Sequence, residues 1–190
     1  CEVTGIDYNV KQNQKLKNYI NHNLDDGLPE INYDQFDYIL ILDVIEHLKN
    51  PENFFVELKE KLKNNSKAKV LISTPNIAFF IMRFMLLFGK FNYGSRGILD
   101  KTHTRLFTFS SFSNLVRQSD YNVLKTFGVP APFQLAIGEN FLSRFLETLN
   151  ILLIKLSKKL FSFQIFLVIK PNTSLDKLLE QAETNAKDKI

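Results

Sequence analysis

The sequence predicts an α/β domain whose β-sheet is mostly parallel, and three observations support this fold class. Apolar segments with strand character alternate with a helical segment over residues 3–74, the links between them are short, and 45% of the 190 residues are hydrophobic while 23% are charged. Strand, helix and strand in alternation are typical of a parallel sheet covered by helices. The length suffices for one globular domain with its own core.

The first half of the chain supplies the expected parallel strands. They are residues 3–6, 19–24, 36–43 and 69–74. The strongest is 36–43, whose apolar run is of the kind that parallel sheets bury on both faces. Pro51 and Glu52 begin a helix expected over 52–63, because proline suits the first helical turn and a carboxylate suits its dipole. The polar, Lys-rich residues 8–17 are expected to form a short exposed helix or a loop.

The second half is expected to complete the domain. Residues 109–118 follow Ser/Thr helix-start signals, and residues 121–128 and 161–170 have strand character. Residues 171–190 are polar and are expected to form a tail. We therefore expect one domain over residues 1–170, followed by this tail.

The composition excludes several function classes. One cysteine rules out an intramolecular disulfide and a cysteine-rich zinc site, and it fits a reducing compartment such as the cytoplasm. The net charge of +4 is mild and most cations are dispersed lysines, so no nucleic-acid partner is expected. No apolar stretch approaches 18 residues, which argues against a membrane-spanning helix.

Asp7 is the first candidate for a functional side chain. It ends the strand expected at 3–6, and ligands of such sheets bind outside the carboxyl ends of the strands. A carboxylate there can accept hydrogen bonds from both hydroxyls of a ribose. The alternative is an aspartate that only forms a turn.

Further motifs favour the ligand-binding interpretation. In order, the chain carries Asp7, Asn-Leu-Asp-Asp-Gly-Leu-Pro at 23–29, Asp-Val-Ile-Glu-His-Leu at 43–48 and Ser-Thr-Pro-Asn at 73–76. Together they resemble the class I S-adenosylmethionine-dependent methyltransferases. They are most similar to the branch that includes ubiquinone-biosynthesis O-methyltransferases and enzymes linked to surface-sugar clusters. The resemblance covers about residues 2–128, with weaker similarity at 103–108 and 161–164.

This resemblance implies a Rossmann-like methyltransferase sheet and a cofactor site. Strands 3–6, 37–43 and 69–74 would share one sheet, strand 161–170 would run antiparallel beside them, and about residues 77–160 would form a variable substrate or cap segment. The residues implied to bind S-adenosylmethionine are Asp7, Tyr8, Asn23, Leu24, Leu42 and Asp43. Asp7 would hold the ribose and Tyr8 would lie beside the adenine. Asn23 departs from the usual aspartate, so its amide oxygen would accept from the adenine amino group without a charge.

The family's first strand and glycine-rich loop have no counterpart in this sequence. The chain starts at Cys1, close to the strand expected at 3–6, and its seven glycines form no such cluster. In the family the missing strand lies between those expected here at 3–6 and 37–43. The resemblance therefore implies an N-terminally truncated domain, which would bind cofactor weakly and be inactive by itself.

Two histidines are the candidate catalytic residues. If a helix begins near residue 43, Asp43, Glu46 and His47 share one face, where they can orient or deprotonate a substrate hydroxyl or hold a divalent cation. The alternative is a helix start with an exposed His47. His103 lies in a loop that borders the substrate in related enzymes, so either His47 or His103 is a candidate base. No resident metal is expected.

The expected function is methyl transfer from S-adenosylmethionine to a hydroxyl of a small molecule or a sugar. One alternative is a non-catalytic module that keeps the fold for docking to a partner or a membrane. A less favoured one is a nicotinamide-dependent oxidoreductase, since Asp7 would serve that ribose equally well. The motif at 43–48 and the absence of a Tyr-x-x-x-Lys pair argue against it.

Two apolar segments, 77–88 and 141–160, have two interpretations. In the second, leucines at helical spacing are accompanied by four cations: Leu142, Leu146, Leu149, Leu153 and Leu160, with Arg144, Lys155, Lys158 and Lys159. The favoured interpretation is a cap over the sheet whose apolar stripe faces inward. The alternative is peripheral contact with an anionic membrane surface.

Overall fold

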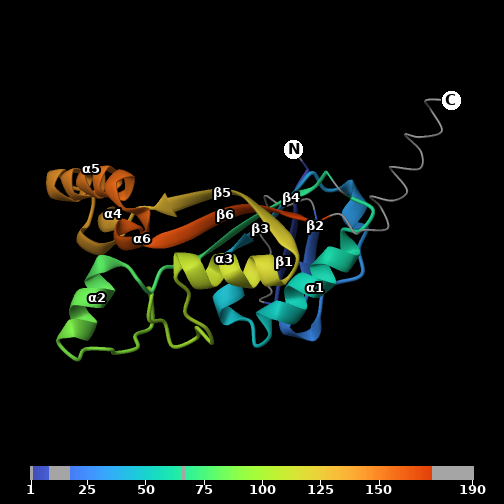
Figure 1. Cartoon of the computed structure of the whole chain (residues 1–190), viewed down its shortest axis with the longest axis horizontal. Helices are drawn as coiled ribbons and strands as arrows, with labels where there is room; N and C mark the ends of the chain where they lie inside the picture. The colour runs from blue at the N-terminus through green and yellow to red at the C-terminus, as the bar shows by residue number, and fades with distance from the viewer. Residues whose placement is uncertain (1, 9–17, 66, 173–190) are drawn as a thin grey trace.

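The computed structural model describes residues 2–8, 18–65 and 67–172, and Figure 1 shows their arrangement. The strands are β1 (Thr4–Asp7), β2 (Asn18–Asn21), β3 (Tyr38–Leu42), β4 (Lys69–Pro75), β5 (Tyr121–Val129) and β6 (Gln164–Pro171). The α-helices are α1 (Pro51–Lys61), α2 (Phe80–Leu87), α3 (Phe109–Gln118), α4 (Phe133–Ile137), α5 (Phe141–Leu156) and α6 (Lys158–Phe161). Short 3₁₀ helices are η1 (Leu24–Asp26), η2 (Tyr33–Gln35) and η3 (Ile45–His47). Residues 9–17 of the expected helix or loop, and residues 173–190 of the expected tail, lie outside the described residues.

The strands form two sheets, which confirms the α/β class but corrects the expected single sheet. β3 and β4 pair in parallel, and β6 runs antiparallel to β4 and β5, giving the order β3-β4-β6-β5. β1 pairs in parallel only with β2, in a separate sheet. The prediction that residues 3–6 and 37–43 share a sheet is therefore wrong for the described chain. The reason is that no described strand lies between β1 and β3 to carry the hydrogen bonds from one to the other.

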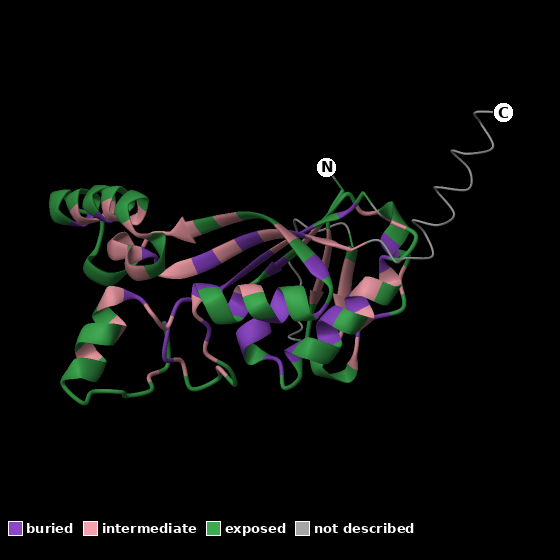
Figure 2. Ribbon diagram, viewed as in Figure 1, coloured by how far each residue is buried: buried purple, intermediate pink, exposed green. Residues whose placement is uncertain are grey.

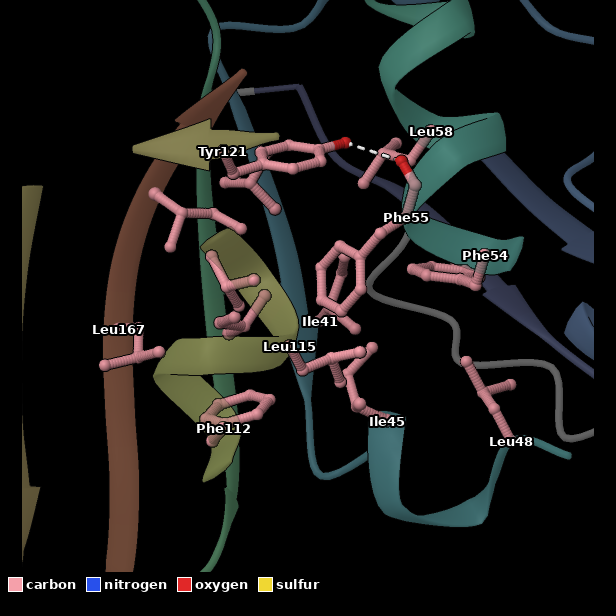
Figure 3. Packing of buried hydrophobic residues seen from close by; sticks show 14 of the residues in the cluster. Ile41, Ile45, Leu48, Phe54, Phe55, Leu58, Phe112, Leu115, Tyr121 and Leu167 are labelled. Carbon is pink, nitrogen blue, oxygen red and sulfur yellow. Dashed lines mark hydrogen bonds between the residues drawn. The ribbon is translucent and has the colours of Figure 1, made fainter. Parts of the chain in front are cut away.

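The core lies between one face of the larger sheet and the helices α1 and α3. Phe55 of α1 and Phe112 of α3 are fully buried against alternate residues of β4 and β6 (Figures 2 and 3). The buried Tyr121 hydroxyl donates to the Phe55 carbonyl oxygen at 3.0 Å, which ties the start of β5 to α1. These contacts confirm the helices expected at 52–63 and 109–118.

The opposite face of this sheet is largely exposed. Tyr38, Leu40 and Leu42 of β3 are 57%, 61% and 47% exposed, and Leu124 and Phe127 of β5 are exposed as well. The prediction that the apolar run at 36–43 is buried on both faces is therefore wrong for the described residues. The described helices α1 and α3 both cover its other face.

The helices α2, α4, α5 and α6 lie together at the end of the molecule farthest from β1 and β2 (Figure 1). A small apolar cluster joins them to the sheet, with Phe79 at its centre in edge contact with Phe163. On α5, however, the buried residues are polar: Ser143 and Asn150. Of the stripe expected to face inward, Leu142 and Leu149 are exposed, while Leu146, Leu153 and Leu160 are half-buried, so the prediction holds only in part.

Asn76 fixes the turn after β4, in the Ser-Thr-Pro-Asn motif. Its fully buried amide nitrogen donates to the carbonyl oxygens of Lys159 at 3.1 Å and Ser162 at 2.9 Å. Its amide oxygen accepts from the Ala78 backbone at 3.1 Å. One side chain therefore joins the ends of β4, α6 and β6.

Asn76→Ala is expected to destabilise the protein, because the buried Ser162 carbonyl oxygen loses its donor at roughly 1–3 kcal/mol and the half-buried Lys159 carbonyl oxygen loses one as well. Urea denaturation followed by circular dichroism measures the loss. The matched control is Asn114→Ala, at an exposed position on α3. Equal stabilities of the two variants would contradict the importance of Asn76.

Candidate functional site

A pocket of about 580 Å³ opens at the carboxyl ends of the parallel strands β1, β2 and β3. Its lining comes from β1, from the residues that follow β1, β2 and β3, from η1 and η3, and from the loop before α3: Ile6, Asp7, Tyr8, His22, Asn23, Leu24, Asp25, Asp43, Val44, His47, Leu48 and Thr102. The structure thus brings together six of the eight residues named from the sequence. Leu42 and His103 are the two that do not line this pocket.

Asp7 and Tyr8 form the β1 side of the pocket. The Asp7 carbonyl oxygen accepts from the His22 backbone N–H at 3.1 Å and from the Tyr19 hydroxyl at 3.3 Å. Asp7 is exposed, and the Tyr8 ring is 67% exposed. The backbone at the end of β1 is thereby fixed while both side chains remain accessible from the pocket.

Asn23 has a structural role of its own. Its side-chain oxygen accepts from the Asp25 backbone N–H at 3.1 Å, which caps η1. Asp25 in turn accepts from the Lys49 backbone N–H at 2.9 Å. These bonds join the β2 side of the pocket to the turn after β3, so Asn23 helps to shape the pocket whatever ligand it meets.

Asp43 does not share a face with Glu46 and His47, and that expectation is wrong. No α-helix begins at residue 43. Asp43 adopts a left-handed backbone conformation with φ of 52°, and only Ile45–His47 is helical. The Asp43 carboxylate accepts from the Ser73 hydroxyl at 2.8 Å and from the Gln164 amide at 2.6 Å. These contacts direct it towards β4 and β6.

Glu46 is the most unusual group of the site. Its side chain is 1% exposed, and neither carboxylate oxygen has a hydrogen-bond partner among the described residues. Removal from water and the nearby Asp43 charge raise the pKa of Glu46 to about 7. Polar groups of its own backbone and of Thr74 offset part of this rise. At neutral pH both protonation states of the Glu46 carboxyl group are therefore populated.

His47 and His103, the two candidate bases, lie in contact in the structure. Their rings meet edge to face with centroids 4.8 Å apart. His47 Nδ1 lies 3.2 Å from the Thr102 carbonyl oxygen, and His103 Nδ1 lies 2.9 Å from that of Ile98. Because a carbonyl oxygen only accepts, each Nδ1 carries the proton, and each neutral ring keeps its lone pair on Nε2.

The loop that carries His103 is fastened to η3. The Glu46 carbonyl oxygen accepts from the Thr104 backbone at 2.8 Å and from the Thr104 hydroxyl at 3.0 Å. The same hydroxyl lies 2.7 Å from the Leu48 carbonyl oxygen. Thr104 thus holds the two histidine-bearing segments in one arrangement.

Glu46, His47 and His103 can together hold a divalent cation. Each offers one ligand atom, and these atoms lie within 4.8 Å of one another. One carboxylate and two imidazoles form a ligand set used for zinc and for iron. The sequence suggested Asp43 rather than His103 as the third ligand. Residues 47 and 103 are far apart in the chain, so no sequence spacing indicates that they meet.

Sequence reasoning missed the residues that position the site. Ser73 and Gln164 hold the Asp43 carboxylate, and Thr104 holds the His103 loop. Each stands in a segment that the motifs had marked, but nothing in the sequence pairs residues 43 and 164.

Comparison with known proteins agrees with this geometry. The model of a family described as a methyltransferase domain matches residues 1–126, so the chain belongs to this family. An S-adenosylmethionine-dependent methyltransferase from Archaeoglobus fulgidus has a similar structure, with a TM-score of 0.56 at 17% identity over 89% of this chain and 75% of its own. An S-adenosylmethionine-dependent methyltransferase from Mesorhizobium loti is also similar, with a TM-score of 0.53 at 12% identity over 89% of this chain and 80% of its own. No curated protein matches the sequence significantly.

The fold alone does not specify the reaction. The [4+2]-cyclase SpnF is similar to this chain as well, with a TM-score of 0.52 at 11% identity over 91% of this chain and 68% of its own. The α/β fold of the S-adenosylmethionine-dependent methyltransferases is thus established, while the acceptor must be argued from the site.

The stability of the protein is expected to fall as pH rises from about 5 to 8, in part because of Glu46. An unfolded glutamate ionises near pH 4.5 and the folded one near 7, so the folded state binds more protons between these values. This difference in pKa stabilises the folded state by about 3 kcal/mol. The stabilisation is fully present below the lower pKa and is lost above the higher one.

Urea denaturation of Glu46→Gln and the unsubstituted protein, at pH 5 and pH 8 in EDTA, isolates this effect. The variant should lose about 2.5 kcal/mol less than the unsubstituted protein over this range, because part of the effect is already lost at pH 5. Glu60→Gln, at an exposed position on α1, is the control and should change nothing. Identical pH dependence in all three proteins would contradict the assignment to Glu46.

Proposed function

We propose that this domain transfers a methyl group from S-adenosylmethionine to a hydroxyl group of a small molecule or a sugar. The observation that carries the proposal is the pocket itself, whose wall runs from Asp7 at the end of β1 to His47 in η3. Its volume of about 580 Å³ is in the range of pockets that hold ligands of this size.

The residues of the pocket fit the cofactor. In this proposal the Asp7 carboxylate would accept from the two ribose hydroxyls, Tyr8 would lie beside the adenine, and Leu24 and Val44 would supply apolar lining, since all four line the pocket. Asn23 Oδ1 already caps η1 but has a second lone pair for the adenine amino group. When bound, S-adenosylmethionine supplies an electrophilic methyl group on a positively charged sulfur.

The histidine pair supports a hydroxyl acceptor. A hydroxyl must lose its proton as it becomes methylated, and an Nε2 lone pair on His47 or His103 can accept it. The fixed Nδ1 contacts orient both rings without help from the acceptor. Alignment of the acceptor with the methyl group supplies much of the remaining rate enhancement.

We infer that one further strand joins the two sheets in the complete protein. Two observations support it: β3 is the edge strand of the four-stranded sheet, and β1 and β2 form a separate sheet. A glycine-rich loop after that strand would bring backbone N–H groups to the cofactor. This chain is accordingly expected to bind S-adenosylmethionine weakly.

We also propose a cytoplasmic location, because a single cysteine fits a reducing compartment.

A non-catalytic module is the second candidate function. The observation in its favour is that Asn23, in place of the usual aspartate, serves a cap and lacks a charge. Such a module would keep the fold and its contacts but release no S-adenosylhomocysteine.

Asp7→Ala in the complete protein is expected to weaken S-adenosylmethionine binding tenfold or more, because two hydrogen bonds to a charged group are lost. Isothermal titration calorimetry measures the affinity. Asp34→Ala, at an exposed position in η2 away from the pocket, is the control. Unchanged affinity in a folded Asp7→Ala variant would remove Asp7 from the site.

His47→Ala and His103→Ala are expected to identify the base. Substituting the base should lower kcat by about 10²–10⁴ while the affinity for S-adenosylmethionine is nearly kept. Release of S-adenosylhomocysteine with a panel of phenols and monosaccharides first finds an acceptor and then measures turnover. A folded double variant with full turnover would leave alignment as the mechanism.

The same assay separates a base from a metal ligand. If the pair acts as a base, EDTA leaves turnover unchanged. If Glu46, His47 and His103 hold a required cation, EDTA abolishes turnover and Zn²⁺ or Mn²⁺ restores it. The second result would replace the proposed base by a cation that binds the acceptor oxygen.

A further inference from the structure

We propose that α2 and α5 form a surface that docks the protein on an anionic lipid bilayer without crossing it. The defining residues, here called the apolar surface, are exposed side chains of these two helices and the residue after α2: Phe84, Leu87, Phe88, Leu142, Phe145, Leu149, Leu152 and Leu156. No described helix is long and apolar enough to span a membrane.

The orientation of α5 is the first observation. Leu142, Phe145, Leu149, Leu152 and Leu156 recur at alternating spacings of three and four, which places them on one stripe of the helix. They are 40–80% exposed. An apolar stripe of a helix ordinarily packs inward, and this one faces solvent.

Hydrogen bonds of the opposite face hold this orientation. Asn150 is 3% exposed, and its side chain accepts from the Ala131 backbone at 2.9 Å and donates to the Phe161 carbonyl oxygen at 2.9 Å. The buried Ser143 and Asn140 form a reciprocal cap at the start of the helix. Turning the stripe inward would break these bonds and leave buried polar groups without partners.

The helix α2 carries further exposed apolar side chains at the same end of the molecule (Figure 1). Phe84, Leu87 and Phe88 are 62%, 78% and 64% exposed. The start of α2 is fixed to the same end of the protein, because Phe80 contacts Phe161 with ring centroids 5.7 Å apart. Figure 2 shows exposed residues dominating both helices at this end of the molecule.

Charge favours an anionic lipid surface as the occupant. Residues 80–96 contain three cations and no acidic residue, and residues 133–161 contain four cations and two acidic residues. On α5, Arg144 and Lys155 are exposed, while Glu147 is half-buried and accepts from Gln134. Lysine and arginine side chains can reach phosphate headgroups while neighbouring leucines and phenylalanines enter the acyl region.

The same charges disfavour a second copy of this chain. An antiparallel or parallel pair of α5 helices would bring Arg144 and Lys155 of one copy near cations of the other, without exposed carboxylates on α5 to neutralise them. A bilayer containing phosphatidylglycerol supplies the opposite charge.

Vesicle flotation tests the proposal on the complete protein. Vesicles of phosphatidylglycerol and phosphatidylcholine in a 3:7 ratio should bind the protein, and pure phosphatidylcholine vesicles should bind it at least tenfold more weakly. Phe145→Ser with Leu152→Ser should lower binding at least tenfold by removing apolar area. Arg144→Glu with Lys155→Glu should lower it at least tenfold on the anionic vesicles alone.

The matched control is Leu124→Ser with Phe127→Ser. It removes one leucine and one phenylalanine side chain from β5, and both are about as exposed as Phe145 and Leu152. It should bind vesicles like the unsubstituted protein, and thermal denaturation checks that every variant is folded. Absence of binding to anionic vesicles would overturn the proposal. A dimer in solution that Phe145→Ser with Leu152→Ser dissociates, with no vesicle binding, would assign the surface to self-association.

Discussion

The burial of Ile45 and Leu48 is the constraint on which the candidate site depends. Ile45 of η3 packs near Phe55 and Ile41, and Leu48, the residue after η3, belongs to the same core cluster (Figure 3). These two buried residues flank Glu46 and His47. Glu46 is buried with no hydrogen-bond partner among the described residues for its carboxylate, and His47 lines the pocket. The chemistry of the site is thus a consequence of how a turn is anchored.

Besides the apolar core, hydrogen bonds from asparagine side chains to the backbone stabilise the fold. Asn65 donates to the Phe36 carbonyl oxygen at 2.8 Å and accepts from the Ala68 backbone at 3.2 Å. Asn76 and Asn150 likewise donate to and accept from backbone groups of other segments. A side-chain amide can donate to a backbone carbonyl oxygen and accept from a backbone N–H. One asparagine can therefore pair loop backbone groups that apolar packing alone would leave without hydrogen bonds.

Apolar packing and asparagine hydrogen bonds dominate at different ends of the molecule. At the end with β1, β2 and α1, the core fixes a pocket lined by titratable groups. At the end with α2 and α5, polar anchors hold apolar side chains in solvent (Figure 2).

The sequence by itself determined the local elements and the strand-end positions of the site. Apolar periodicity predicted α1, α3, β3 and β4, and the motifs placed Asp7, Asn23 and His47 where one pocket forms, since these signals act over a few residues. Only the tertiary structure decided the partners of Asp43, the pairing of His47 with His103 and the outward stripe of α5. Those features depend on contacts between distant segments, such as Gln164 with Asp43 and Asn150 with Ala131, and no local spacing encodes them.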